Sequence, residues 1–231
     1  MSDLLNLLLF LVVVLASIEV QHRLRPISPL RLKAREWEVN SKNTFLEVKG
    51  WLEISNPHPR MEIMIPSIKL ETVLLGKNDM RNLKTKTRIT PHHPDEESRS
   101  DGYWAAYIVK SRETTRVHVT VQIELEEQDG IAISPESLWL NIYYANYGPF
   151  GLINHQEGVL ITIQTPLFVP PSEAQFIKAQ DYKLLPIKTH ILGTLDEPLN
   201  VLQDYAGHLI QPGDILTIGE TPLAVMQGRY R

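Results

Sequence analysis

The stretch Val117-His118-Val119-Thr120-Val121-Gln122-Ile123-Glu124-Leu125 decides the fold class, because apolar and polar side chains alternate along it without interruption. A period of two is typical of a strand that has one face in the core and the other in water. The same alternation recurs in short runs across residues 31–166, separated by turn-forming Gly, Pro, Asn and Asp. The other apolar sets are Leu46, Val48, Leu52 and Ile54; Ile63, Ile65, Ile68, Leu70 and Leu74; Leu83 and Ile89; Leu138, Leu140, Ile142 and Tyr144; and Val159, Ile161 and Ile163.

About seven to nine such strands, with no convincing amphipathic helix among them, predict a mainly β chain built on an antiparallel two-sheet β-sandwich over residues 31–166. Pro66 interrupts one run and predicts a bulge or an edge strand at that position. Residues 103–110, which begin Tyr-Trp-Ala-Ala-Tyr, are predicted to form a core strand. The Asn56-Pro57 step after an alternating strand resembles the immunoglobulin-like sandwich of late-embryogenesis-abundant (LEA) proteins of the water-stress type.

The composition excludes several classes of function. The chain has 231 residues, of which 43% are hydrophobic and 22% charged, as in an ordinary globular protein. Its formal net charge of −4 offers no basic footprint, so we expect no nucleic-acid partner. The absence of cysteine excludes disulfides, thiol catalysis and thiolate-bound metal centres.

The N-terminus reads as a hydrophobic anchor. Residues 4–18, Leu-Leu-Asn-Leu-Leu-Leu-Phe-Leu-Val-Val-Val-Leu-Ala-Ser-Ile, are almost wholly apolar, and with the flanking residues they reach about the length of a membrane span. We therefore predict a single-pass transmembrane helix over residues 1–22. Basic residues follow this segment and none precedes it, which predicts a cytoplasmic body. These residues are Arg23, Arg25, Arg31, Lys33 and Arg35. A cleaved signal peptide and a core helix are the alternatives.

Ligand-type side chains are densest in residues 91–102, Pro-His-His-Pro-Asp-Glu-Glu-Ser-Arg-Ser-Asp-Gly. Histidines and carboxylates this close are suited to a divalent ion. However, His92 and His93 lie between two prolines in an extended backbone and should point apart, so a solvated loop is favoured and no metal ligand is assigned. The aromatic residues Tyr143, Tyr144, Tyr147 and Phe150 are interpreted as packing at one end of the sandwich, with a partner surface as the alternative. No catalytic residue is assigned.

Residues 167–181, which contain Pro170-Pro171, are predicted to be a linker. The remaining residues, 182–231, follow a distinct order. A β-leaning entry at residues 184–190 precedes a short helix that opens at Asp196-Glu197. A turn at Gln211-Pro212-Gly213-Asp214 then leads into a predicted buried strand, Ile215-Leu216-Thr217-Ile218. A small-residue helix from Glu220 ends in Gly228-Arg229.

That order resembles the N-terminal edge of the coenzyme F420-0:γ-glutamyl ligase family. The anchor, the sandwich with its Asn-Tyr-Gly-Pro-Phe-Gly turn at residues 146–151, and the entry Pro-Ile-Lys-Thr-His at residues 186–190 together resemble membrane-anchored homologues of that ligase in photosynthetic bacteria. Relative to this pattern, we expect the chain to be the N-terminal part only, truncated within the ligase module, which leaves an α+β fragment at residues 182–231.

The resemblance implies GTP- and Mg²⁺- or Mn²⁺-dependent amide formation with L-glutamate in the complete family. It aligns a guanine-nucleotide-binding turn with Thr189, His190, Ile191 and Leu192, and a small hydroxyl residue of the same site with Thr221. The family's metal-binding carboxylates align with nothing in this chain, so no cofactor is expected in the fragment alone. Val225 stands where the family has a lysine, and Glu220 adds a negative charge, so we expect GTP binding to be weak at best.

Two functions follow as hypotheses. In the first, the chain is the N-terminal part of a γ-glutamyl ligase-like protein, inactive by itself, whose partners are the membrane and either a separately encoded ligase remainder or a second copy of the chain. In the second, it is a membrane-tethered β-sandwich interaction or scaffold protein without catalysis.

Overall fold

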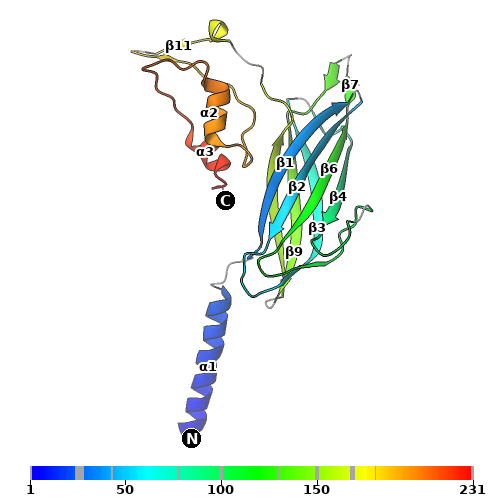
Figure 1. The fold of residues 1–231 in the computed structure, drawn as a ribbon. Coiled ribbons are helices and arrows are strands. Elements are labelled where there is room, and N and C mark those ends of the chain that lie inside the picture. Colours follow the sequence, from blue (N-terminus) through cyan, green and yellow to red (C-terminus); the bar gives the residue numbers. More distant parts are fainter. Residues whose placement is uncertain are drawn as a thin grey trace.

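The structure, a computed structural model, describes residues 2–23, 29–42, 44–77, 79–98, 101–128, 131–148, 151–166, 170–179 and 181–229 (Figure 1). Its helices are α1 (Ser2–Arg23), α2 (Pro198–Ala206) and α3 (Glu220–Met226), with a short 3-10 helix η1 (Pro171–Glu173). Its strands are β1 (Arg31–Lys42), β2 (Phe45–Ser55), β3 (Ile63–Leu75), β4 (Thr85–His92), β5 (Tyr107–Val109), β6 (Thr114–Glu124), β7 (Glu126–Gln128), β8 (Ile131–Ile133), β9 (Ser137–Gly148), β10 (Gly151–Thr162), β11 (Ile177–Lys178) and β12 (Lys183–Leu184).

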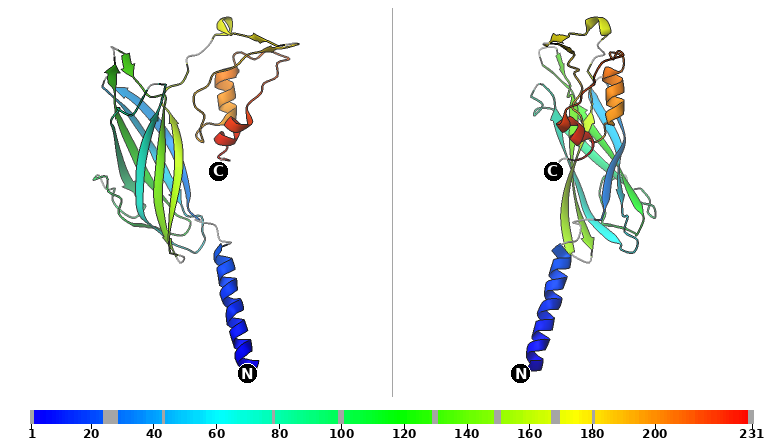
Figure 2. Two further views of the ribbon diagram at one scale, coloured as in Figure 1. Left: turned by 180° about the vertical axis from the view of Figure 1, so that it is seen from behind. Right: turned by 90° about the vertical axis from the view of Figure 1, so that its left-hand side faces the viewer.

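Two four-stranded antiparallel sheets form the sandwich (Figure 2). The first has the order β1-β2-β6-β4 and the second has the order β10-β9-β3-β5. The core lies between them and consists of the alternating apolar residues that the period of two selects. The prediction of a mainly β chain with an immunoglobulin-like antiparallel sandwich is confirmed. The proposed division of the whole chain into four parts stays a prediction.

The prediction of a bulge at Pro66 is also confirmed. The register of β3 against β9 shifts between Met64 and Ser67, and β3 is an interior strand of its sheet. Proline has no amide hydrogen to give to a ladder, so an interior strand accommodates it where the pairing is locally broken.

The strand predicted at residues 103–110 is wrong in extent, because β5 covers Tyr107–Val109 only. The side chain of Trp104 is buried and its Nε1–H donates to the carbonyl of Ile65 at 2.9 Å. The indole therefore attaches an irregular segment to the core, and of the aromatic residues in this run only Tyr107 lies in a ladder.

A carboxyl group lies between the sheets, where the alternation would place an apolar residue. Glu157 shares the inward face of β10 with Val159 and Ile161, and Tyr144 donates its hydroxyl hydrogen to Glu157 Oε1 at 2.9 Å. Burial raises the pKa of Glu157 and the hydrogen bond from Tyr144 partly opposes that rise. The sandwich therefore contains one acid that is more easily protonated in the folded chain than in the unfolded chain.

The N-terminal helix α1 has 22 residues and exposes its apolar side chains. Its segment Asp3–Gln21 is long and apolar enough to cross a membrane, and a signal sequence has the same length and composition. Figures 1 and 2 place α1 beyond the end of the sandwich where β1 starts.

The C-terminal part confirms some local predictions and overturns others. The helix after Asp196 is α2, the helix from Glu220 is α3, and the turn at Gly213, whose φ is 98°, closes with Asp214 N–H donating to Gln211 O at 3.1 Å. The buried strand predicted at residues 215–218 is wrong, because this segment forms no strand and the side chain of Ile215 is 89% exposed. No described strand lies beside it, and an apolar run without a partner cannot form a ladder.

Of the β-leaning entry predicted at residues 184–190, only Leu184 lies in a strand, β12, which pairs with β11. The residues from 185 to 190 continue without strand pairing. The segment predicted as a linker contains η1 and β11.

We expect Glu157→Gln to raise the free energy of unfolding at pH 8 and to have little effect near pH 4. A carboxyl whose folded pKa exceeds its ordinary value of 4.5 binds more protons when folded, so stability falls as the pH rises through the folded pKa. Glutamine keeps an acceptor for Tyr144 and removes this titration. Urea midpoints of both proteins in detergent at pH 4, 6 and 8 measure the effect. Parallel curves for the two proteins would contradict the assignment.

Candidate functional site

The loop before α2 docks on the outer face of the second sheet, and this contact positions the site. Leu160 of β10 points away from the sandwich core, yet its side chain is buried. Gly193 lies against it so closely that a Cβ on Gly193 would be 2.9 Å from Leu160 Cβ. Since real Cβ atoms do not approach that closely, the docking requires glycine at this position.

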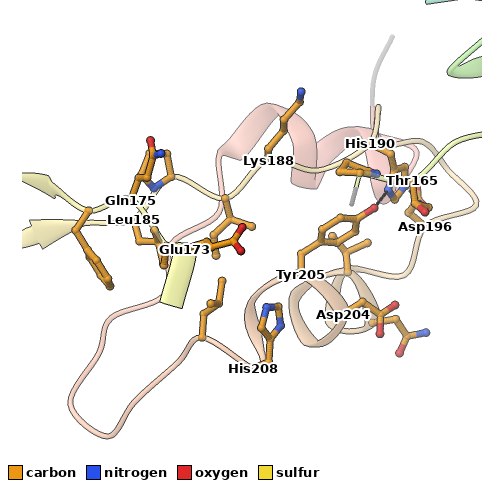
Figure 3. Close-up of a pocket in the computed structure, with 18 of the residues that line it drawn as sticks. Thr165, Glu173, Gln175, Leu185, Lys188, His190, Asp196, Asp204, Tyr205 and His208 are labelled. Carbon is orange, nitrogen blue, oxygen red and sulfur yellow. Dashed lines mark hydrogen bonds and ion pairs between the residues drawn. The ribbon is translucent and has the colours of Figure 1, made fainter. Parts of the chain in front are cut away.

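A chain of hydrogen bonds connects this loop to α2 (Figure 3). Tyr205 OH lies 2.6 Å from His190 Nδ1, and His190 Nε2 lies 3.0 Å from Asp196 Oδ1. Gly193 N–H donates to Asp196 Oδ2 at 2.7 Å. Because the carboxylate only accepts, His190 Nε2–H donates to Asp196, and Nδ1 of that tautomer accepts the hydroxyl hydrogen of Tyr205.

The electrostatics of this hydrogen-bond network favour an ionised Asp196 and a neutral Tyr205. Burial would raise the pKa of Asp196, but the hydrogen bonds from His190 and Gly193 outweigh it and hold the pKa below its usual range. Burial raises the pKa of Tyr205, and the carboxylates of Asp196 and Asp204 add to the rise. Every proton in this hydrogen-bond network is already shared, so the network fixes the loop and supplies no activated nucleophile.

A cavity of about 990 Å³ opens beside this network, between α2 and the segments that precede it (Figure 3). Its charged lining residues are four acids and one lysine: Glu173, Asp196, Glu197, Asp204 and Lys188. Apolar and polar side chains complete the wall, among them Phe176, Leu185, Asn200, Tyr205 and His208. A lining with this charge balance repels a polyphosphate.

The nearest helix terminus is also unavailable to an anion. Glu197 caps α2, and its Oε2 accepts the amide hydrogens of Leu199 at 2.7 Å and Asn200 at 3.0 Å. These are the amides that a bound phosphate would use. The carboxylate of the protein takes the place of such a ligand.

The structure separates the residues predicted to bind nucleotide. His190 lines the cavity, whereas Thr189, Ile191, Leu192 and Thr221 are not among the lining residues. Thr189 Oγ1 donates to the carbonyl of His190 at 2.9 Å, and Thr221 is exposed on α3. The nucleotide role of these five residues stays a prediction.

The two adjacent histidines point to opposite sides of the first sheet, as the extended backbone predicts. His92 packs against Trp51 on the outer face, with ring centroids 4.9 Å apart. His93 is buried, stacks on Tyr107 at 3.7 Å, and hydrogen-bonds Thr115 Oγ1 through Nδ1 at 2.7 Å. The prediction of a solvated loop is therefore wrong for His93, because the rings of Trp104 and Tyr107 pack against it. Among the described residues no group of three metal-ligating side chains is present.

The aromatic residues of β9 also differ in how deeply they are buried. Tyr144 is buried between the sheets, Tyr143 is half-buried, and Tyr147 is exposed. Phe150 lies outside the described residues. Sequence reasoning missed Tyr205, because no local pattern shows that the last turn of α2 returns to a histidine that lies fifteen positions earlier.

Comparison with known proteins identifies the sandwich. A family model described as the N-terminal Ig-like domain of F420-0:gamma-glutamyl ligase matches residues 31–165. No curated protein matches. The solved GAE domain of GGA2p from Saccharomyces cerevisiae is 12% identical over 59% of this chain and 94% of its own, with a TM-score of 0.33. The ASH/PapD-like domain 7 of human CEP192 is 10% identical over 58% and 86%, with a TM-score of 0.25.

We expect Asp196→Asn to loosen the C-terminal part while the sandwich keeps its stability. The amide cannot accept from both His190 and Gly193 as the carboxylate does, and losing a charge-assisted bond costs about 1.5–3 kcal/mol. Limited proteolysis of residues 170–229, followed by mass spectrometry, should show faster cleavage.

The control is Asp204→Asn, since Asp204 is exposed on α2 and lines the same cavity. In the unmodified chain the protection of residues 170–229 from proteolysis should persist at pH values above 3.8, the ordinary pKa of aspartate. It should be lost as the pH falls through the lowered pKa of Asp196 in the folded chain. Equal cleavage of both variants would show that the network does not hold the loop.

Proposed function

The chain belongs to the family of N-terminal Ig-like domains of F420-0:gamma-glutamyl ligases. On this premise we propose that it is the membrane-anchored N-terminal part of a γ-glutamyl ligase-like protein, and that it holds the start of a ligase module at a fixed distance from the bilayer. The chemistry implied for the complete protein is GTP-driven amide formation with L-glutamate. This chain by itself does not catalyse that reaction.

The observation that carries the proposal is the docking of Gly193 on Leu160. It holds the loop that the resemblance aligns with a nucleotide-binding turn against the outer face of β10. α1 precedes one end of the sandwich, and the C-terminal part follows Thr162 at the opposite end. Twelve-residue strands separate these ends by about 40 Å. The Ig-like domain thus acts as a rigid spacer.

The charges around the loop support the inactivity of the chain alone. The cavity beside His190 is lined mainly by acids, and Glu197 occupies the first amides of α2. Glu220 lies in the first turn of α3, where it would repel a phosphate. Val225 has no charge with which to replace the family's lysine. A functional nucleotide site therefore needs groups from outside this chain.

A second candidate function, an interaction protein without catalysis, is favoured by the exposed apolar side chains of the C-terminal part. They are Leu184, Ile191, Leu195, Leu199, Ile210, Ile215 and Leu216. A surface of this kind is typical of a segment that is covered by another protein. Its occupant would be a separately encoded ligase remainder under the first function and a second copy or an unrelated protein under this one.

We expect the purified chain to show no micromolar GTP binding and no release of GDP in the presence of L-glutamate and Mn²⁺. Each missing charge-assisted contact costs about 1.5–3 kcal/mol, or roughly 10- to 150-fold in affinity. Calorimetric titration with GTP and Mn²⁺ measures the binding directly. The double substitution Glu220→Gln and Val225→Lys should improve it, because it removes a repulsion and restores a cation.

Micromolar binding by the unaltered chain would contradict the proposal, most clearly if Thr189→Ala or Thr221→Ala abolished it. Thr87→Ala is the matched control, since Thr87 lies on β4 of the sandwich. Binding that survived both of the first substitutions and the control would place a nucleotide site elsewhere.

We expect the chain to stay in the membrane pellet after alkaline carbonate extraction, with its body shielded from protease added to intact cells. The reason is an apolar helix followed by basic residues and preceded by none. Mass spectrometry of the intact protein separates the alternatives. A soluble product that lacks its first residues would identify a signal sequence and refute the anchor.

A further inference from the structure

A row of four apolar side chains crosses the outer face of the second sheet at one end. The ladder pairs Ile108 of β5 with Met64 of β3, Met64 with Tyr147 of β9, and Tyr147 with Leu152 of β10. Directly paired residues of antiparallel strands share a face. We call this set the apolar end row. Ile108 is 47% exposed, Tyr147 50% and Leu152 59%.

Between the apolar end row and the opposite end of the second sheet, the outer face of this sheet is polar. Above the row the ladder carries Ser67 with Asn154 beside Ala145, then Lys69, Tyr143 and Gln156. At the far end Val73, Trp139 and Leu160 form a second apolar row, and the docked loop of Gly193 lies on Leu160. The C-terminal part thus covers Leu160 at the far end, where Val73 remains 46% exposed, and three of the four side chains of the apolar end row are about half exposed.

The apolar end row lies at the end of the sandwich where β1 begins. Arg31, the first residue of β1, pairs with Ser55, the last residue of β2. The next residue, Asn56, donates from its side chain to the carbonyl of Val109 at 3.0 Å, and Val109 is the neighbour of Ile108. These contacts bring the start of β1 and the row to the same end of the sandwich.

The chain between α1 and β1 is too short to let this end move far from α1. Leu30 is buried in the core, and six residues lie between it and Arg23 at the end of the helix. The seven steps along the chain from Arg23 to Leu30 span at most about 25 Å. If α1 crosses the bilayer, the apolar end row is therefore held close to the headgroups.

We propose that the apolar end row inserts into the interfacial layer of the bilayer that α1 crosses, so that the sandwich rests on the membrane at this end rather than projecting freely from its anchor. The proposal rests on the membrane insertion of α1 proposed above. Tyrosine is enriched at membrane–water interfaces because its ring is apolar and its hydroxyl group is polar. Because α1 tethers the sandwich to the bilayer, the effective concentration of lipid around the row is high. A weak contact made by four side chains is then sufficient.

A lipid surface suits the row better than a protein partner. A stable protein interface buries about 800 Å² on each side, which is far more than four partly exposed side chains in one row offer. The surrounding charges are mixed, with Arg60, Lys110 and Arg112 near Glu62 and Glu113. The contact should therefore form on zwitterionic lipid and should not require anionic headgroups.

The test uses single cysteines, because the chain contains none of its own. Leu152→Cys carries an environment-sensitive fluorophore in the full chain, reconstituted at low density into phosphatidylcholine vesicles with nitroxide quenchers in the headgroup region. Leu11→Cys, measured in vesicles that carry the nitroxides deep on the lipid acyl chains, reports on the insertion of α1. Val73→Cys is the matched control, because Val73 is exposed on the same strand as Met64, nine residues away toward the opposite end.

We expect quenchers to lower the fluorescence at Leu152→Cys by about twofold and to leave that at Val73→Cys unchanged, as interfacial depth predicts. Replacing Ile108 and Tyr147 by serine should remove most of the quenching at Leu152→Cys without changing that at Leu11→Cys. Deep quenching at Leu11→Cys with none at Leu152→Cys would overturn the lipid contact and leave the anchor intact. A blue shift at Leu152→Cys without quenching would identify a protein contact and also overturn it. An unquenched Leu11→Cys would refute the anchor itself.

Discussion

The side chain of Asn56 is the contact on which the arrangement of the two sheets depends. It is 1% exposed, and its amide donates to the carbonyls of Met61 at 2.7 Å and Val109 at 3.0 Å. Its Oδ1 accepts the amide hydrogen of His58 at 3.1 Å, and its own backbone N–H donates to Glu113 O at 2.9 Å. One residue thereby fixes the crossover between the sheets, the last residue of β5 and the turn before β6. Without these four hydrogen bonds, polar groups at and around the buried Asn56 would be left unpaired at high cost.

This contact also determines what lies at each end of the molecule. Because the crossover, β5 and the start of β1 are held together, the helix α1 and the apolar end row share one end. The C-terminal part follows β10 from the other end and docks back through Gly193 and Leu160. The sandwich therefore separates the apolar helix α1 and the apolar end row from a polar cavity, and its strand length sets the distance between them.

The sandwich could be predicted from the sequence because strand patterning is local. Alternation identifies which residues of β2, β6 and β9 face the core, and Pro66 predicts the break in β3. The prediction fails where a strand needs a partner that lies elsewhere. Residues 215–218 are apolar enough for a strand but find no ladder, and in the run from Tyr103 the buried ring of Trp104 belongs to a loop. The contact between His190 and Tyr205 depends on how α2 packs, which no periodicity records.

The adjacent acids Asp196 and Glu197 illustrate why a resemblance in sequence does not by itself define a site. Asp196 accepts from His190 and Gly193 and so shapes the loop that rests on Leu160, while Glu197 satisfies the first amides of α2. Both carboxylates are engaged in building the local structure. An anion that used the same amides would first have to displace Glu197, losing the cap and unpairing a carboxylate beside three further acids. Positive charge or a metal ion from outside this chain would reverse that balance, because the acids that repel a phosphate are the groups that would hold a cation. The function proposed above therefore treats the acid-rich lining as one wall of a site that another protein segment completes, rather than as a nucleotide pocket of this chain alone.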